Sequence, residues 1–179
     1  MGFTLVIIVL ALVAALFFLR VSRGHSEAIS NLDDLAGRTQ AVDLRAFRNL
    51  VDPAETLFLK RTLTPADFRR VHRERLRAEA EYVQRIAHNA AVLLRLGQAA
   101  RTNPNPEIAN AAASIVESAL FVRMIAMKAF IKLRLQLLVP GIVISTIEVL
   151  DRYGRLTDSV ALFTRLQRPA YASHVLGML

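Results

Sequence analysis

An uncharged run of eighteen residues, Gly2 to Leu19, opens the chain and constrains its fold more than any other feature. Only Thr4 in this run is polar. Eighteen helical residues rise about 27 Å, close to the roughly 30 Å hydrocarbon thickness of a bilayer. A cleaved signal peptide would need a basic start, a shorter apolar core and small residues at the cleavage site. No basic residue precedes this run, and it ends in Phe17-Phe18-Leu19-Arg20. We therefore predict an uncleaved transmembrane helix at residues 2–21.

Basic residues flank this predicted anchor on its C-terminal side only. Arg20 and Arg23 follow the apolar run, whereas the N-terminal side carries only the α-amino group. Membrane proteins keep an excess of Lys and Arg on the cytoplasmic side. We therefore expect a single-pass protein of a bacterial-type inner (cytoplasmic) membrane, with its N-terminus outside and its C-terminal domain in the cytoplasm.

Arginine dominates the charge of the chain and limits its partners. The formal net charge is +8, and the 23 basic residues comprise twenty Arg and three Lys. This surplus favours anionic lipid, acidic proteins or nucleic acid as partners, although an Arg-rich genome would give the same bias. The chain contains no Cys, which excludes disulfides, thiolate metal sites and cysteine nucleophiles.

A polar segment separates the predicted anchor from a helical domain. Residues 22–38 lack apolar periodicity, so we expect a juxtamembrane linker there. Three helix-start signals follow, each placing a proline at the first helical position behind a capping side chain. They are Asp52-Pro53-Ala54-Glu55, Thr64-Pro65-Ala66-Asp67 and Asn105-Pro106-Glu107. They predict an all-α domain over residues 39–168, a helical hairpin or bundle with a long central helix, and then a tail at 169–179.

A long hairpin is the predicted core of this domain. One helix is expected at about residues 65–100, because apolar residues recur along it at three-, four- and seven-residue steps. Its other face carries Arg–Glu pairs four residues apart, which predict a solvated face. Gly97 is expected to fray the end of this helix. The turn-forming run Thr102-Asn103-Pro104-Asn105 then leads into an antiparallel partner helix at about 106–139.

The stretch from Leu120 to Leu150 is more apolar than a small helical domain is expected to bury. Four basic side chains in its first half make a membrane-spanning helix costly there. We interpret the stretch as buried core or as a surface for protein or lipid. The residues expected to contact a partner are Phe121, Met124, Met127, Phe130 and Ile131. Shorter helices are predicted at about 142–153, with Gly154 as its stop, and at about 157–167.

A cluster of five arginines lies near the start of the long helix. Its members are Arg69, Arg70, Arg73, Arg75 and Arg77. No zipper, helix-turn-helix spacing or interleaved aromatic residues accompany the cluster, so nucleic acid is an unlikely partner. Beside a membrane anchor, the nearest polyanion is anionic lipid. The alternatives are an acidic protein partner and a face that is merely solvated.

No catalytic constellation or cofactor motif is evident. His72 and His88 point about 160° apart on one helix, so they cannot share a site. His88 and Glu117 are the residues on which a minor alternative, an enzymatic or cofactor-carrying subunit, would depend. A hydrogen-bonded structural histidine is the simpler interpretation of His88. Glu117 and Glu148 lie in apolar surroundings in the sequence, where carboxylates paired with basic side chains are the simpler interpretation. We therefore expect no enzyme activity, no metal and no cofactor.

These features predict a non-catalytic interaction protein, either a scaffold or an accessory subunit of a larger membrane complex. Other membrane-protein subunits or further copies of the chain are the expected partners. The alternative is a protein that lays its basic amphipathic helices on an anionic membrane surface and organises it.

Overall fold

The structure, a computed structural model, describes residues 12, 35, 37–138 and 146–167. Within these residues it contains five helices and no strand, which confirms the all-α prediction. None of the described helices combines the length and the apolar character needed to cross a bilayer. The predicted anchor at 2–21 lies outside the described residues except for Leu12, and the predicted tail at 169–179 lies outside them entirely.

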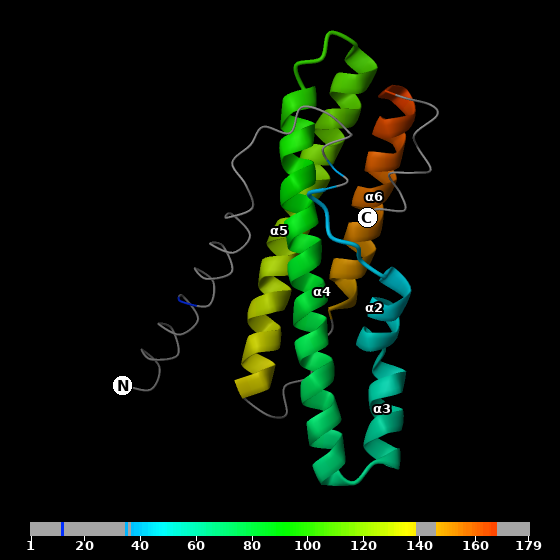
Figure 1. Ribbon diagram of the computed structural model, residues 1–179, viewed down its shortest axis with the longest axis vertical. Coiled ribbons are helices and arrows are strands. Elements are labelled where there is room, and N and C mark those ends of the chain that lie inside the picture. Colours follow the sequence, from blue (N-terminus) through cyan, green and yellow to red (C-terminus); the bar gives the residue numbers. More distant parts are fainter. Residues whose placement is uncertain (1–11, 13–34, 36, 139–145, 168–179) are drawn as a thin grey trace.

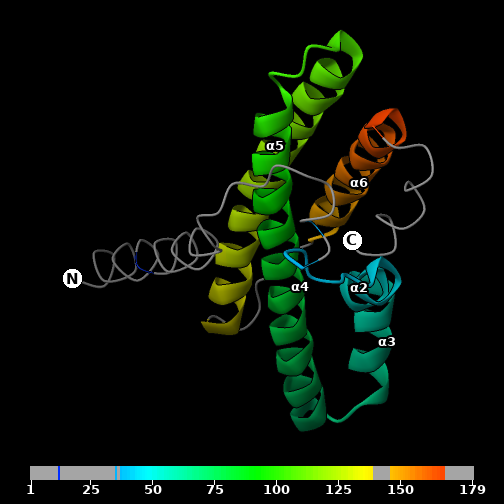
Figure 2. The same ribbon diagram turned by 45° about the horizontal axis from the view of Figure 1, so that its top comes forward.

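Two long antiparallel helices form the centre of the fold, and three others pack along them (Figure 1). The five helices are α2 Leu44–Val51, α3 Pro53–Thr62, α4 Pro65–Ala100, α5 Pro106–Leu138 and α6 Ile147–Gln167. Helix α6 packs against α5 and α4, while α2 and α3 lie beside the N-terminal half of α4. Figure 2 shows that α4 continues past the end of α5 and that only α3 accompanies it there.

The three predicted helix starts are confirmed. The Asp52 carboxylate accepts a hydrogen bond from the backbone N–H two residues later at 2.9 Å and caps α3. The Thr64 hydroxyl accepts from the Asp67 N–H at 3.2 Å and donates to the Asp67 carboxylate at 2.7 Å, which caps α4. Asn105 accepts from the N–H of Glu107 at 2.9 Å at the start of α5. Each cap satisfies a backbone donor that the first helical turn leaves free.

Helix α2 is an element that the sequence analysis missed. The Asp43 carboxylate caps it by accepting from the N–H groups of Arg45 and Ala46, each at 2.9 Å. Its side chains Phe47 and Val51 are buried, and the Phe47 ring stacks on Tyr82 of α4 with 5.2 Å between ring centroids. An eight-residue helix is too short to be stable alone, so this packing holds it in place.

Close packing of small side chains joins α4 and α5. The buried side of α5 repeats at alternating three- and four-residue steps, and many of its members are alanine. These residues are Ala112, Ile115, Ala119, Val122, Ala126, Ala129, Leu133 and Gln136. Gly97 of α4 lies against this side, because a Cβ placed there would meet a Val116 methyl at 2.9 Å and the Ala112 carbonyl oxygen at 3.0 Å. The expectation that Gly97 frays the helix was wrong: α4 continues to Ala100, and Gly97 permits close approach.

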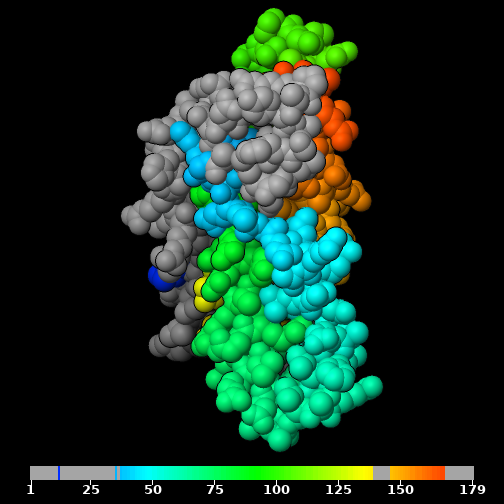
Figure 3. All heavy atoms as spheres, turned by 45° about the vertical axis from the view of Figure 1, so that its right-hand side comes forward, coloured from blue at the N-terminus to red at the C-terminus, as the bar shows by residue number. Residues whose placement is uncertain are grey.

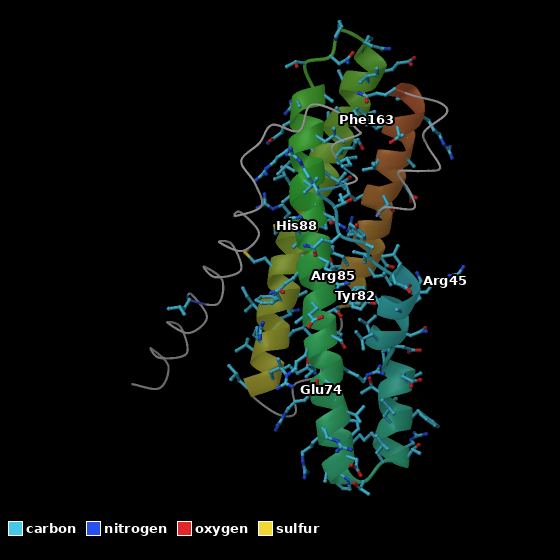
Figure 4. All side chains as sticks on the ribbon, viewed as in Figure 1. Arg45, Glu74, Tyr82, Arg85, His88 and Phe163 are labelled. Atoms are coloured by element: carbon cyan, nitrogen blue, oxygen red, sulfur yellow. The ribbon has the colours of Figure 1, made fainter. Side chains whose placement is uncertain are left out.

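The final helical segment is one helix where two were expected. Two helices were predicted, at about 142–153 and 157–167 with a stop at Gly154, but α6 runs without a break through Gly154. Residues 142–145 lie outside the described part of the chain. One apolar side of α6 continues on both sides of the glycine and includes the fully buried Tyr153 and Phe163. Phe163 is labelled on α6 in Figure 4. Burial of this side outweighs the roughly 1 kcal/mol that glycine costs inside a helix.

Candidate interaction surface

The N-terminal part of α4 and the whole of α3 form an arm, residues 53–75, that extends past the core. No residue from 52 to 75 is buried, and α3 buries no side chain at all. In Figure 3 the arm forms the lower end of the molecule. Hydrophobic burial supplies most of the stability of a fold, and the arm has little of it. The arm is therefore held mainly by its helix caps and by the covalent continuation of α4 into the core.

The five clustered arginines divide into three kinds in the structure. Arg69 and Arg73 are exposed on the arm. Arg70 pairs with Asp67 at 3.1 Å and Arg77 with Glu74 at 2.6 Å, both at a separation of three residues. Arg75 is half-buried and donates to the backbone carbonyl of Leu50 at 2.8 Å. It therefore attaches α2 to α4, and the exposed Arg69 and Arg73 are the members best placed for an anionic partner.

Apolar side chains accompany these charges on the arm. Leu57 and Phe58 of α3 are 54% and 60% exposed. On α4 the rings of Phe68 and His72 stack with 5.4 Å between centroids. Partial burial and the nearby Arg75 charge lower the pKa of His72, so the imidazole favours its neutral form. The arm thus combines exposed guanidinium groups with exposed hydrophobic side chains.

The side of α5 that faces away from α4 and α6 carries a second apolar surface, the outer stripe. It consists of Leu120, Met124, Met127, Ile131 and Leu138. Leu120 is 52%, Met124 55% and Leu138 66% exposed, while Met127 and Ile131 are half-buried.

Only part of the predicted partner-contact set belongs to this surface. Of the five residues expected, Met124, Met127 and Ile131 lie on the outer stripe. The structure contradicts a surface role for Phe130, which is only 4% exposed, because its position on the helix points its side chain towards the core. Phe121 is half-buried, with the Arg152 guanidinium of α6 4.4 Å from its ring centroid. Leu120 and Leu138 complete the stripe, and their regular spacing was the signal that could have found them.

A buried polar network that the sequence analysis missed attaches the segment before α2 to the bundle. The fully buried Asn89 side chain accepts from the Gln40 N–H at 2.8 Å and donates to the Gln40 carbonyl at 2.7 Å. It also donates to the Tyr153 hydroxyl at 2.8 Å. Burial raises the pKa of Tyr153 to about 12, so the phenol stays protonated.

The last residues of the predicted linker at 22–38 pack against the helical bundle. Leu35 is 1% exposed and belongs to the hydrophobic core. The imidazole Nε2 of His88 lies 2.8 Å from the carbonyl oxygen of Arg38, so this residue is attached to α4 by a hydrogen bond. His88 therefore has the structural environment that the simpler interpretation expected.

The carboxylates differ from their predicted surroundings. Glu117 and Glu148, expected in apolar environments, are both exposed. Glu79, expected on the solvated face as a partner of Arg75, is buried and accepts a hydrogen bond from the Thr146 hydroxyl at 3.3 Å. Burial raises the pKa of Glu79 to about 7, against the opposing effects of Thr146 and the Arg75 charge. Among the described residues no cluster of three or more His, Asp or Glu side chains is arranged to hold a metal ion.

Comparisons of the chain with family models, with curated proteins and with solved structures give no match. The function is therefore inferred from the chemical character of the arm and the outer stripe. One surface is basic with exposed apolar side chains, and the other is an apolar stripe on a helix. Both are suited to contact with another molecule.

Proposed function

We propose that this chain is a membrane-anchored, non-catalytic interaction protein, a scaffold or accessory subunit that contacts its partner through the outer stripe of α5. The observation that carries the proposal is a row of apolar residues along one helix face. Leu120, Met124 and Leu138 of this row are exposed, and Met127 and Ile131 are half-buried. Single exposed hydrophobic residues are common, whereas a contiguous row of them marks a contact site. The uncharged run at Gly2 to Leu19 supports the membrane part of the proposal.

A pull-down from native membranes tests the contact. The tagged full-length chain is solubilised in mild detergent, and co-purifying proteins are quantified by mass spectrometry. We expect a stoichiometric partner to remain with the wild-type chain and to be lost with Met124→Arg. The matched control is Leu162→Arg, since Leu162 of α6 is 55% exposed, like Met124. Partner retention by both variants, or no partner at all, would contradict the proposal.

Thiol labelling tests the membrane part separately. Because the chain has no Cys, a single cysteine at the exposed Thr102 between α4 and α5 is a unique label. We expect an impermeant maleimide to label Thr102→Cys only after the membrane is permeabilised. We also expect the chain to resist alkaline extraction from membranes. Labelling of intact cells would reverse the proposed topology, and release by alkali would remove the anchor.

A second candidate function, contact with an anionic membrane surface, is favoured by the arm. Arg69 and Arg73 are exposed there together with Leu57 and Phe58. Basic residues are attracted to anionic headgroups, and apolar side chains enter the interface. A chain without residues 2–21, which removes no described core residue, is expected to bind anionic vesicles but not neutral ones. Arg69→Glu/Arg73→Glu should abolish binding, whereas the charge-matched control Arg45→Glu/Arg48→Glu on α2 should retain it.

A further inference from the structure

The spacing of the outer stripe is that of a helix that pairs with another helix. From Leu120 the stripe proceeds to Met124, Met127 and Ile131 by steps of four, three and four, and Leu138 lies seven residues further on. This 3.5-residue average keeps a stripe facing a partner helix when the two cross at a small angle. Towards the start of α5, Ala113 and Glu117 continue the same steps and are exposed.

Charge divides α5 into two halves. Its acidic residues, Glu107 and Glu117, both precede Leu120, and both are exposed. Its basic residues, Arg123, Lys128, Lys132 and Arg134, all follow Leu120. A parallel copy of α5 would place like charges together along the contact. An antiparallel copy can place Glu117 of each helix opposite Arg134 of the other, and it also opposes the two helix dipoles.

From these two features we infer that the outer stripe binds the outer stripe of a second copy of this chain, antiparallel and about a two-fold axis near Met124 and Met127. In this register Leu120 lies opposite Ile131 of the second copy, and Met124 lies opposite Met127. Ala113 lies opposite Leu138, so a small side chain faces a large one. The apolar residues therefore match each other under the symmetry, as an isologous interface requires.

The inference rests on the proposed function, because it names the partner of the surface assigned there. A second copy is favoured over an unrelated protein because, in this register, Glu117 of each chain lies opposite Arg134 of the other. An unrelated partner would have no reason to mirror the order of charges within α5. Between Glu117 and Arg134 no position on the stripe is charged, which leaves a continuous apolar centre from Leu120 to Ile131.

Cysteine cross-linking in native membranes tests the pairing and its direction. The full-length chain is expressed with a single cysteine and treated with a short bismaleimide. Met124→Cys is expected to give a covalent dimer, and the control Leu162→Cys is expected to give none. Ala113→Cys and Leu138→Cys expressed separately should not cross-link, because an antiparallel pair places two Ala113 positions about 37 Å apart along the helix. The two variants expressed together should cross-link to each other.

A second measurement does not depend on added thiols. The mass of the full-length chain in mild detergent is measured by sedimentation equilibrium as a function of concentration. We expect a dimer whose Kd is raised at least about tenfold by Met124→Arg at the centre of the contact, and unchanged by Leu162→Arg. Both positions are exposed, so both variants should fold, and circular dichroism checks this.

The possible outcomes separate the inference from the proposed function. A monomer in both assays overturns the inference, and so does Ala113→Cys linking to itself, which indicates a parallel pair. Cross-linking of Met124→Cys to a different membrane protein also overturns self-pairing, but it leaves the proposed interaction function in place. The proposed function is removed only if the pull-down from native membranes also retains no partner.

Discussion

Replacement of Glu79 by glutamine is expected to stabilise the fold at neutral and alkaline pH. The Glu79 side chain lies on α4 with 8% of its surface exposed, and its only described hydrogen-bond donor is the Thr146 hydroxyl at 3.3 Å. A charged carboxylate in this position is poorly solvated. Burial therefore raises its pKa to about 7, even though Thr146 and the Arg75 charge oppose the change. Glutamine has nearly the same shape and no charge to bury.

The sign of the effect follows from proton binding. The folded chain holds the Glu79 proton more tightly than the unfolded chain, so the associated stability is fully present below the unfolded pKa near 4.5. It is lost as the pH rises through the folded pKa of about 7. This difference in pKa corresponds to about 3 kcal/mol of unfolding free energy, lost between the two values. The Glu79→Gln variant should not show this loss.

Urea denaturation followed by circular dichroism measures the effect. The wild-type chain, Glu79→Gln and the control Glu81→Gln, whose side chain is exposed, are compared at about pH 5 and about pH 8.5. We expect the wild type and the control to lose stability at the higher pH, and Glu79→Gln to retain it. Equal pH dependence in all three proteins would refute the argument that burial of this carboxylate controls stability.

Three further predictions concern packing and buried polar groups, each measured by thermal or urea denaturation. Gly97→Ala should destabilise by about 1 kcal/mol, because crowding against α5 outweighs the gain in helix propensity. Gly154→Ala, where a Cβ meets nothing within 4 Å, should stabilise by about 1 kcal/mol, and the reverse order would contradict the close approach at Gly97. Asn89→Ala should lower the free energy of unfolding by about 2–4 kcal/mol and Tyr153→Phe by only about 1 kcal/mol. The reason is that Asn89 makes three hydrogen bonds, of which one is to Tyr153. Equal losses would show that the backbone contacts of Asn89 contribute nothing. Gln136→Leu should stabilise by about 1 kcal/mol, since the buried Gln136 Oε1 has no hydrogen-bond partner among the described residues. A loss of stability would indicate that this group is satisfied.

Local signals predicted the helices whose boundaries depend on nearby residues. The Thr64-Pro65 start depends on a side chain and a ring within one turn, and α4 begins at Pro65 as expected. The continuity of α6 through Gly154 depends instead on burial against α4 and α5. A propensity cost of about 1 kcal/mol cannot be weighed against burial until the packing partner is known. The same reasoning explains why Gly97 was interpreted as a point of fraying.

The sequence predicted which helix carries the candidate surface, but only some of the residues that form it. The apolar character of α5 around most of its circumference concealed which side packs inward, so Phe130 and Met124 could not be separated from sequence. Once α4 is known to pack against the alanine-rich side of α5, Phe130 is assigned to the buried residues and Met124 to the exposed side. Glu79 was assigned to the solvated face for a similar reason. Its spacing from Arg75 fits an ion pair, but Thr146, which is 67 residues away in the chain, lies over it.

The proposed pairing and the proposed membrane anchor together constrain the orientation of the domain. Two chains that keep their anchors in one bilayer with the same polarity are related by a two-fold axis along the membrane normal. Antiparallel α5 helices have that axis perpendicular to their length, so α5 would lie parallel to the bilayer. Helix α4 lies alongside α5 (Figure 1), and the arm that extends from it would then follow the membrane surface. If the side of the arm that bears Arg69 and Arg73 faces the bilayer, this orientation permits self-pairing and lipid contact at the same time.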